Sequence, residues 1–114
     1  KQIYSSKILI LGATFKENVP DFRNSKIFDV ASLLHENNIK VEFWDPFFSN
    51  KELKINYKAY IKKPNKLYDG IIIASPHKVF IDMGVNKIKE LGKKNSFIYD
   101  LKGVFDINKT QMRL

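Results

Sequence analysis

The stretch Lys7-Ile8-Leu9-Ile10-Leu11-Gly12 decides the fold class of this 114-residue chain. Its centre is an unbroken run of β-branched and aliphatic residues, without the polar–apolar alternation of a half-exposed strand. Such a run is typical of a strand that is buried on both faces of a parallel sheet, and the glycine ends it. The sequence therefore predicts a sheet that is covered on both sides.

A helix is predicted after the loop that follows this strand. Its apolar residues recur at the spacing of one helix face, and polar residues suited to capping and stopping a helix flank them. The helix is expected to begin near Ser25. The apolar positions are Ile27, Val30, Ala31 and Leu34, the capping candidates are Asn24 and Ser25, and the stop is Asn37-Asn38.

Three further strands and two shorter helices complete the predicted pattern. No two-residue hairpin turn separates the strands, so we expect parallel strands joined by right-handed crossovers. The predicted class is α/β, a Rossmann-like three-layer fold with a mostly parallel sheet, in a single domain over residues 1–114. The strands are expected at 41–44, 68–74 and 96–100, and the short helices at 52–61 and 85–91.

The composition excludes several function classes. No apolar run approaches the roughly 18 residues of a membrane span. The chain has no cysteine, which excludes disulfides, thiolate metal sites and a cysteine nucleophile within these residues. No His, Asp and Glu residues stand at metal-ligand spacing. Because Lys1 is not an initiator methionine and begins no signal peptide, we expect a cytoplasmic fragment of a longer protein.

The net charge of +8 is concentrated in the second half of the chain. Residues 58–114 hold 12 basic and 5 acidic side chains, against 8 and 7 in residues 1–57. A basic half can attract nucleic acid or a nucleotide. Lysine pairs such as Lys62-Lys63 and Lys93-Lys94 are more simply interpreted as solvated surface. A nucleic-acid-binding domain is one alternative, without a recognition motif to support it.

The loop at residues 12–25 is the densest candidate site. Ligands of parallel α/β sheets bind at the carboxyl ends of the strands. This loop leaves a buried strand, carries Lys16 and Arg23, and leads to a helix N-terminus, which together suit phosphate. Gly12 stands alone where a dinucleotide fingerprint has three glycines. From the residues themselves, phosphate binding and a purely structural loop both stay open.

Other polar residues near the strand ends are interpreted as structural. Asp21 and Asn24 are expected to tie down the first loop. His77 has no nucleophile and no paired carboxylate near it in the sequence, so we expect it to stabilise the turn predicted at Ser75-Pro76-His77. Asp45-Pro46 is interpreted as a turn former.

Four longer motifs are more specific than these single residues. The run LGATFKENVPDFRNSK (11–26), followed by VEFWDP (41–46), resembles the start of the C-terminal UDP-binding domain of the UDP-glucose/GDP-mannose dehydrogenase family. It is similar in particular to the branch of UDP-N-acetylhexosamine 6-dehydrogenases. The runs LYDGIIIASPHKVF (67–80) and IYDLKGVFD (98–106) resemble that branch's later segments, in the same order.

The resemblance implies the UDP-sugar-binding domain of an enzyme that oxidises a UDP-N-acetylhexosamine to its uronic acid, with NAD, for surface polysaccharide synthesis. In this family the Phe-Lys pair of the first motif and the basic residue of the last contact the UDP-sugar. Substrate binding is thereby assigned to Phe15, Lys16 and Lys102, and the arginine that reaches NAD corresponds to Arg23. Lys102 stands where glucose dehydrogenases have arginine, so the planar guanidinium fork is lost.

The resemblance also implies what other parts of the parent protein supply. NAD is bound mainly by an N-terminal domain, and the cysteine nucleophile lies upstream of Lys1, so no catalytic residue is assigned here and the fragment is expected to be inactive. The expected partners are the UDP-sugar, the N-terminal and central domains, and a second parent chain in a homodimer, with no nucleic acid and no membrane. A stand-alone nucleotide-binding regulatory α/β module is the alternative, which the length of the open reading frame distinguishes.

Overall fold

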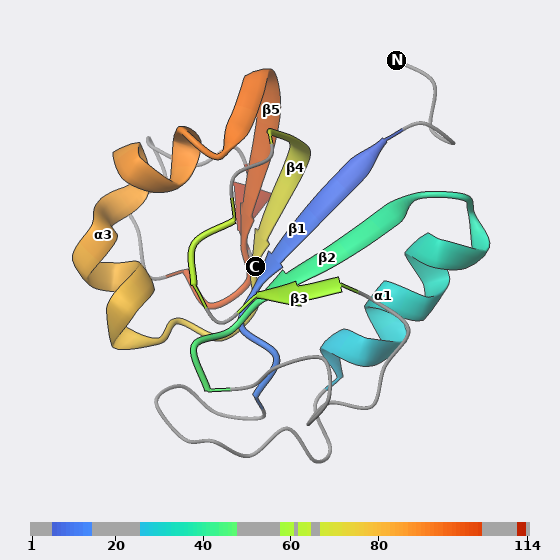
Figure 1. Ribbon diagram of the computed structural model, residues 1–114, viewed down its shortest axis with the longest axis horizontal. Helices are drawn as coiled ribbons and strands as arrows, with labels where there is room; N and C mark the ends of the chain where they lie inside the picture. The colour runs from blue at the N-terminus through green and yellow to red at the C-terminus, as the bar shows by residue number, and fades with distance from the viewer. Residues whose placement is uncertain are drawn as a thin grey trace.

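The computed structural model describes residues 6–14, 26–47, 58–60, 62–64, 67–103 and 112–113, and its strands form one parallel sheet (Figure 1). The order is β3-β2-β1-β4-β5-β6, and each neighbouring pair is parallel. The predicted Rossmann-like α/β class is confirmed, with a sheet that is wholly parallel. The strands are β1 (Lys7–Leu11), β2 (Lys40–Trp44), β3 (Lys58–Tyr60), β4 (Tyr68–Ile73), β5 (Gly92–Asp100) and β6 (Met112–Arg113).

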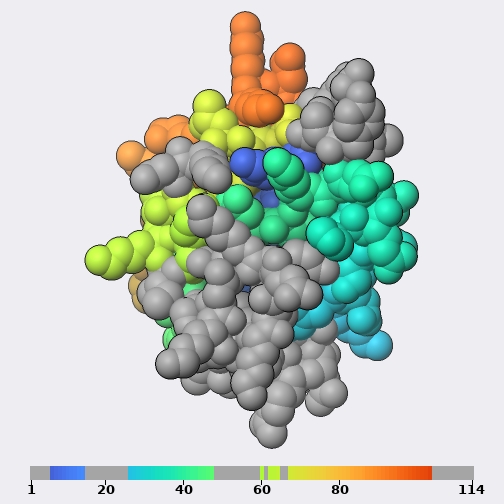
Figure 2. All heavy atoms as spheres, turned by 45° about the vertical axis from the view of Figure 1, so that its right-hand side comes forward, coloured from blue at the N-terminus to red at the C-terminus, as the bar shows by residue number. Residues whose placement is uncertain are grey.

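The helices α1 (Ile27–Glu36) and α3 (Lys78–Lys89) cover opposite faces of the sheet (Figure 1). Successive residues of β1 belong to different cores, since Ile8 and Ile10 pack on the side of α1 and Leu9 and Leu11 on the side of α3. In the space-filling view α1 forms the right-hand face of the molecule (Figure 2). The apolar run of β1 is therefore buried on both faces of the sheet, which forms the middle of three layers, as predicted.

Helix α1 confirms the predicted helix but differs at its start. It begins at Ile27 after the N-cap residue Lys26, which makes no side-chain capping bond. The capping candidates Asn24 and Ser25 lie outside the described residues. Its apolar stripe is narrower than the periodicity indicates, because Val30 is 39% exposed. The predicted stop is confirmed, with Asn38 in the left-handed region at φ 64°.

Helix α3 is longer than the helix predicted over 85–91, because it already begins at Lys78. His77 is its N-cap residue, so the turn expected at Ser75-Pro76-His77 is also the start of a helix. Gly84, at φ 80° and ψ 158°, breaks the helical backbone in the middle and produces a kink. The buried residues Phe80 and Ile88 hold the two parts against the sheet.

The helix predicted over 52–61 is wrong where the structure describes it. Residues 58–60 form the edge strand β3, which pairs with β2 from Glu42 to Trp44. The other residues of that segment, 52–57 and 61, lie outside the described residues. A strand of three residues is too short for a periodic pattern to identify.

Within the described ranges no helix has both the length and the apolar character needed to cross a membrane.

Candidate functional site at the carboxyl edge of the sheet

The carboxyl ends of four strands meet at one edge of the sheet, where parallel α/β folds bind their ligands. Leu11 of β1 is aligned with Trp44 of β2 and with Ile73 of β4, and Ile73 is aligned with Asp100 of β5. The chain continues from β1 to β2 on one side and from β4 to β5 on the other. The strand order therefore reverses between β1 and β4, which makes this the topological switch point.

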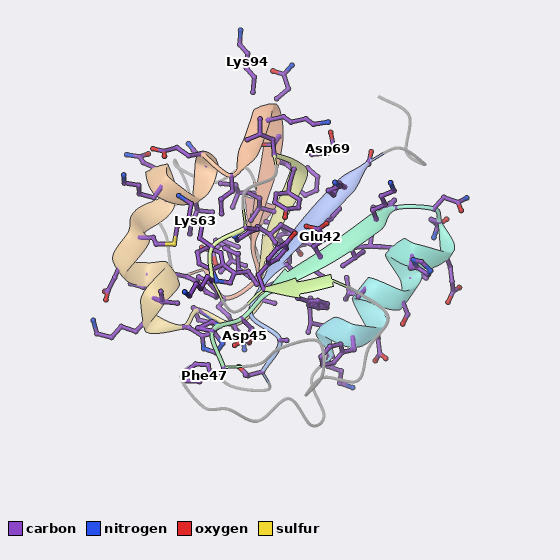
Figure 3. The ribbon with its side chains drawn as sticks, viewed as in Figure 1. Glu42, Asp45, Phe47, Lys63, Asp69 and Lys94 are labelled. Carbon is purple, nitrogen blue, oxygen red and sulfur yellow. The ribbon has the colours of Figure 1, made fainter. Side chains whose placement is uncertain are left out.

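Asp45, the first residue after β2, links three segments at this edge (Figure 3). Its Oδ2 accepts a hydrogen bond of 2.6 Å from the backbone N–H of Ala13, and its Oδ1 accepts one of 2.9 Å from the N–H of Phe47. The Nε2 atom of His77 lies 3.1 Å from the same Oδ2. The side chain is only 1% exposed. Asp45 therefore does more than form the turn that the sequence predicted.

His77 is buried beside Asp45 and joins it to the end of β1. Its Nε2 atom also lies 3.3 Å from Oγ1 of Thr14. The ring of Phe47 meets the His77 ring edge-on, with centroids 4.8 Å apart. The sequence offered His77 no paired carboxylate, but the fold supplies one from 32 positions away. Its expected role in a turn also holds, since its backbone begins α3.

Ser75 closes the gap between the ends of β1 and β4. Its Oγ donates a 2.8 Å hydrogen bond to the carbonyl oxygen of Thr14, and its N–H donates one of 3.1 Å to the carbonyl of Leu11. Gly12 approaches so closely that a Cβ there would lie 2.8 Å from backbone atoms of Ser75. The φ of Gly12 is +93°, so both space and backbone conformation require glycine.

These side chains lie at the switch point, where a dinucleotide-binding domain holds a pyrophosphate. Such a domain uses several glycines to bring bare backbone to the phosphates. Here Thr14, Asp45, Ser75 and His77 are all buried at the switch point. Gly12 is a single glycine where the dinucleotide fingerprint has three, so the end of β1 does not match a dinucleotide-binding loop.

The structure describes one of the four predicted site residues. Lys102 is exposed in the turn after β5, on the same edge as Thr14. Phe15, Lys16 and Arg23 lie outside the described residues, so the binding roles expected of them stay predictions. Across the described ranges, no group of three or more His, Asp or Glu residues is placed to hold a metal ion.

A second buried carboxylate lies away from this edge, in the core beside α3. The hydroxyl of Tyr68 donates a 2.5 Å hydrogen bond to Oε1 of Glu42. Burial, reinforced by the neighbouring Glu42, raises the pKa of Tyr68 far above its ordinary value. Figure 3 shows Glu42 midway along the sheet, between Asp45 at one end and Asp69 at the other. This pair therefore contributes to the core and not to the candidate site.

Comparisons with known proteins point to one family. Residues 9–107 match the UDP-glucose/GDP-mannose dehydrogenase family, UDP binding domain. The chain is 40% identical over 111 residues to the UDP-N-acetyl-D-glucosamine 6-dehydrogenase of Pseudomonas aeruginosa, and 38% identical over 116 residues to that of Salmonella typhi. The alignments cover 96% and 98% of this chain but 26% and 27% of the relatives, so the chain spans about a quarter of their length.

A solved structure shows the same fold. The UDP-glucose dehydrogenase of the archaeon Pyrobaculum islandicum superposes with a TM-score of 0.66 at 23% sequence identity. The superposition covers 95% of this chain and 24% of that one.

Proposed function

Because this chain belongs to the UDP-glucose/GDP-mannose dehydrogenase family, as its UDP binding domain, we propose that it binds the UDP-sugar in a longer NAD-dependent dehydrogenase. The proposed substrate is a UDP-N-acetylhexosamine, which the whole protein oxidises to the uronic acid for surface polysaccharide. The observation that carries the proposal is the family match over residues 9–107. The identity to two UDP-N-acetyl-D-glucosamine 6-dehydrogenases supports the choice of an acetamido sugar.

The proposed contacts come from two loops of the carboxyl edge. Phe15 and Lys16 of the first loop and Lys102 after β5 bind the UDP-sugar, and Arg23 faces the cofactor. The two lysines supply point charges for the pyrophosphate oxygens. The exposure of Lys102 at this edge supports its assignment.

The remaining parts of the activity are proposed to lie outside these 114 residues. The single glycine at the end of β1, where a dinucleotide fingerprint has three, and the lack of cysteine in the sequence both favour a division of labour. Upstream domains hold the NAD and the cysteine nucleophile, and this chain holds the nucleotide of the substrate. The parent protein is proposed to be a cytoplasmic homodimer.

Titration of the chain with UDP, followed by two-dimensional ¹H–¹⁵N NMR, tests the site. UDP should shift the amide signals of residues 12–26 and of those near Lys102. Lys16→Ala should weaken UDP binding about tenfold or more, because a hydrogen bond to a charged group contributes about 1.5–3 kcal/mol. Repeating the titration with UDP-N-acetylglucosamine and UDP-N-acetylgalactosamine then compares the sugars.

Lys94→Ala is the matched control, because Lys94 is an exposed lysine at the opposite end of the sheet (Figure 3). It should leave the UDP affinity unchanged. If UDP shifts no signal at the carboxyl edge, or if both alanine variants weaken binding equally, the proposed site is wrong.

A further inference from the structure

The orientation of the His77 ring is fixed from several sides. The backbone of His77 begins α3, where its carbonyl accepts hydrogen bonds from the N–H groups of Phe80 and Ile81. Its ring lies between those of Phe47 and Phe80, with centroids 4.8 Å and 5.7 Å away. The side chain is 1% exposed. In this buried position the Nε2 atom lies within hydrogen-bonding distance of Asp45 and Thr14.

The chemistry of the neighbours decides which ring nitrogen carries the hydrogen. Nε2 of His77 faces Oδ2 of Asp45 at 3.1 Å and Oγ1 of Thr14 at 3.3 Å. A carboxylate is only an acceptor, and a bare Nε2 lone pair at that distance would be repelled by it. Nε2 is therefore inferred to be a donor, shared between the carboxylate and the hydroxyl.

The contacts of Asp45 and Thr14 extend this hydrogen-bond network to the residues directly after β1. Asp45 Oδ2 also accepts from the N–H of Ala13, and the carbonyl of Thr14 accepts from Ser75 Oγ. Buried partners thus hold both the N–H of Ala13 and the carbonyl of Thr14. The next residues in the chain are Phe15 and Lys16.

We propose that His77 and Asp45 are positioning residues, which hold Ala13 and Thr14 in place at the end of β1 and thereby support the binding of uridine diphosphate by the residues proposed to contact it. This inference rests on the proposed function and adds two residues that do not touch the ligand. A misplacement of about 1 Å in a supporting residue is enough to reduce the effectiveness of a site many-fold.

Two substitutions at one position separate positioning from simple stability. His77→Gln keeps an N–H donor at about the place of Nε2, whereas His77→Leu fills the space and removes the donor. We expect His77→Leu to weaken UDP binding about tenfold and His77→Gln to stay within about threefold of wild type. Calorimetric titrations are run at a temperature at which circular dichroism shows each variant to be folded.

Tyr68→Phe is the control for a buried hydrogen bond lost elsewhere, because it breaks the bond to Glu42 in the core beside α3. It should lower the melting temperature and leave UDP affinity unchanged. If His77→Leu does not fold, Thr14→Val removes the hydroxyl contact and leaves the pair of Asp45 and His77 in place. This variant should weaken UDP binding about threefold, and the amide signals of Ala13 should shift.

The outcomes distinguish the inference from the proposed function. A wild-type chain that does not bind UDP overturns both. A wild type that binds, together with a His77→Leu or Thr14→Val variant of equal affinity, overturns the positioning role alone. The same result follows if His77→Gln loses as much affinity as His77→Leu, because the donor is then irrelevant.

Discussion

A single buried phenol couples the stability of this domain to alkaline pH. Tyr68 is fully buried and donates to Glu42, and burial above all raises its pKa above the ordinary value of 10.0. In the unfolded chain the phenol ionises near its ordinary pKa, whereas in the folded chain it stays protonated. The unfolded state therefore binds fewer protons above about pH 10, and the free energy of unfolding falls there.

We expect the stabilisation by protonated Tyr68 to be fully present below about pH 10. Above that pH the free energy of unfolding should fall by up to about 1.4 kcal/mol per pH unit. Tyr68→Phe removes the ionisable group, so its stability should fall less steeply with pH than that of the wild type. Urea unfolding between pH 7 and about 11 measures both slopes, and the difference cancels the other tyrosines and lysines. Parallel slopes would show that Tyr68 does not titrate differently in the two states.

At pH 7 the Tyr68→Phe variant should be less stable than the wild type by about 1–3 kcal/mol, because Glu42 loses its buried donor.

The sequence predicted the turn roles of Asp45 and His77 but not their pairing. Each has a local explanation, as a turn former before proline and as a residue after a strand. Their contact depends on β1, β2 and β4 being adjacent in register, and no spacing within the sequence contains that information. The sequence identified Gly12 only as the end of a buried strand, whereas its positive φ and its close approach to Ser75 are known from the structure.

Helix α3 shows how one residue shapes an element. Gly84 adopts φ 80° and ψ 158°, a region open almost only to glycine, and nothing lies within 4 Å of where its Cβ would be. The space for a side chain is thus free, but the backbone conformation is not. The kink allows residues on both sides, among them Phe80 and Ile88, to reach the sheet.

Gly84→Ala should destabilise the domain by about 1–3 kcal/mol through backbone strain alone. Asn86→Ala is the control, an exposed position in the same helix where alanine should change stability by no more than about 0.5 kcal/mol. Thermal unfolding of the two variants measures both effects. Equal stability of Gly84→Ala and the wild type would mean that the kink straightens without cost.

The elements that the sequence predicted well are those with long apolar runs. The strands β1, β2 and β4 were placed to within one residue, because their burial on both faces leaves a strong signal. The strand predicted at 96–100 is confirmed as the second half of β5, which begins four residues earlier, at Gly92, in a largely exposed stretch without an apolar run. The edge strands β3 and β6 were missed, since they have three and two residues. The first half of α3 was missed because Ser75-Pro76-His77 was interpreted only as a turn.

The whole chain corresponds to only one part of the longer proteins that it matches. It spans about a quarter of the length of the relatives that it matches, its sequence has no cysteine, and the end of β1 carries one glycine where a dinucleotide fingerprint has three. These observations are consistent with the proposed division of labour between this domain and other parts of a longer protein.

We expect the 114-residue chain to bind UDP without reducing NAD when UDP-N-acetylglucosamine is added. The protein from the complete open reading frame should reduce NAD under the same conditions. Absorbance at the wavelength of the reduced nicotinamide measures both. Reduction of NAD by the isolated chain would contradict the division of labour, and so would an open reading frame that holds this domain alone.

The buried hydrogen bonds at the carboxyl edge also constrain how this domain diverges. They join positions that lie 32 and 63 residues apart in the sequence. Replacing Asp45 alone removes the carboxylate that faces the buried His77 ring, and replacing His77 alone leaves the buried carboxylate without that donor. Each single substitution therefore lowers the free energy of unfolding. Thr14, Asp45 and His77 should therefore change as a set among distant relatives. A chimera that grafts the first loop from another member must bring the ends of β2 and β4 with it.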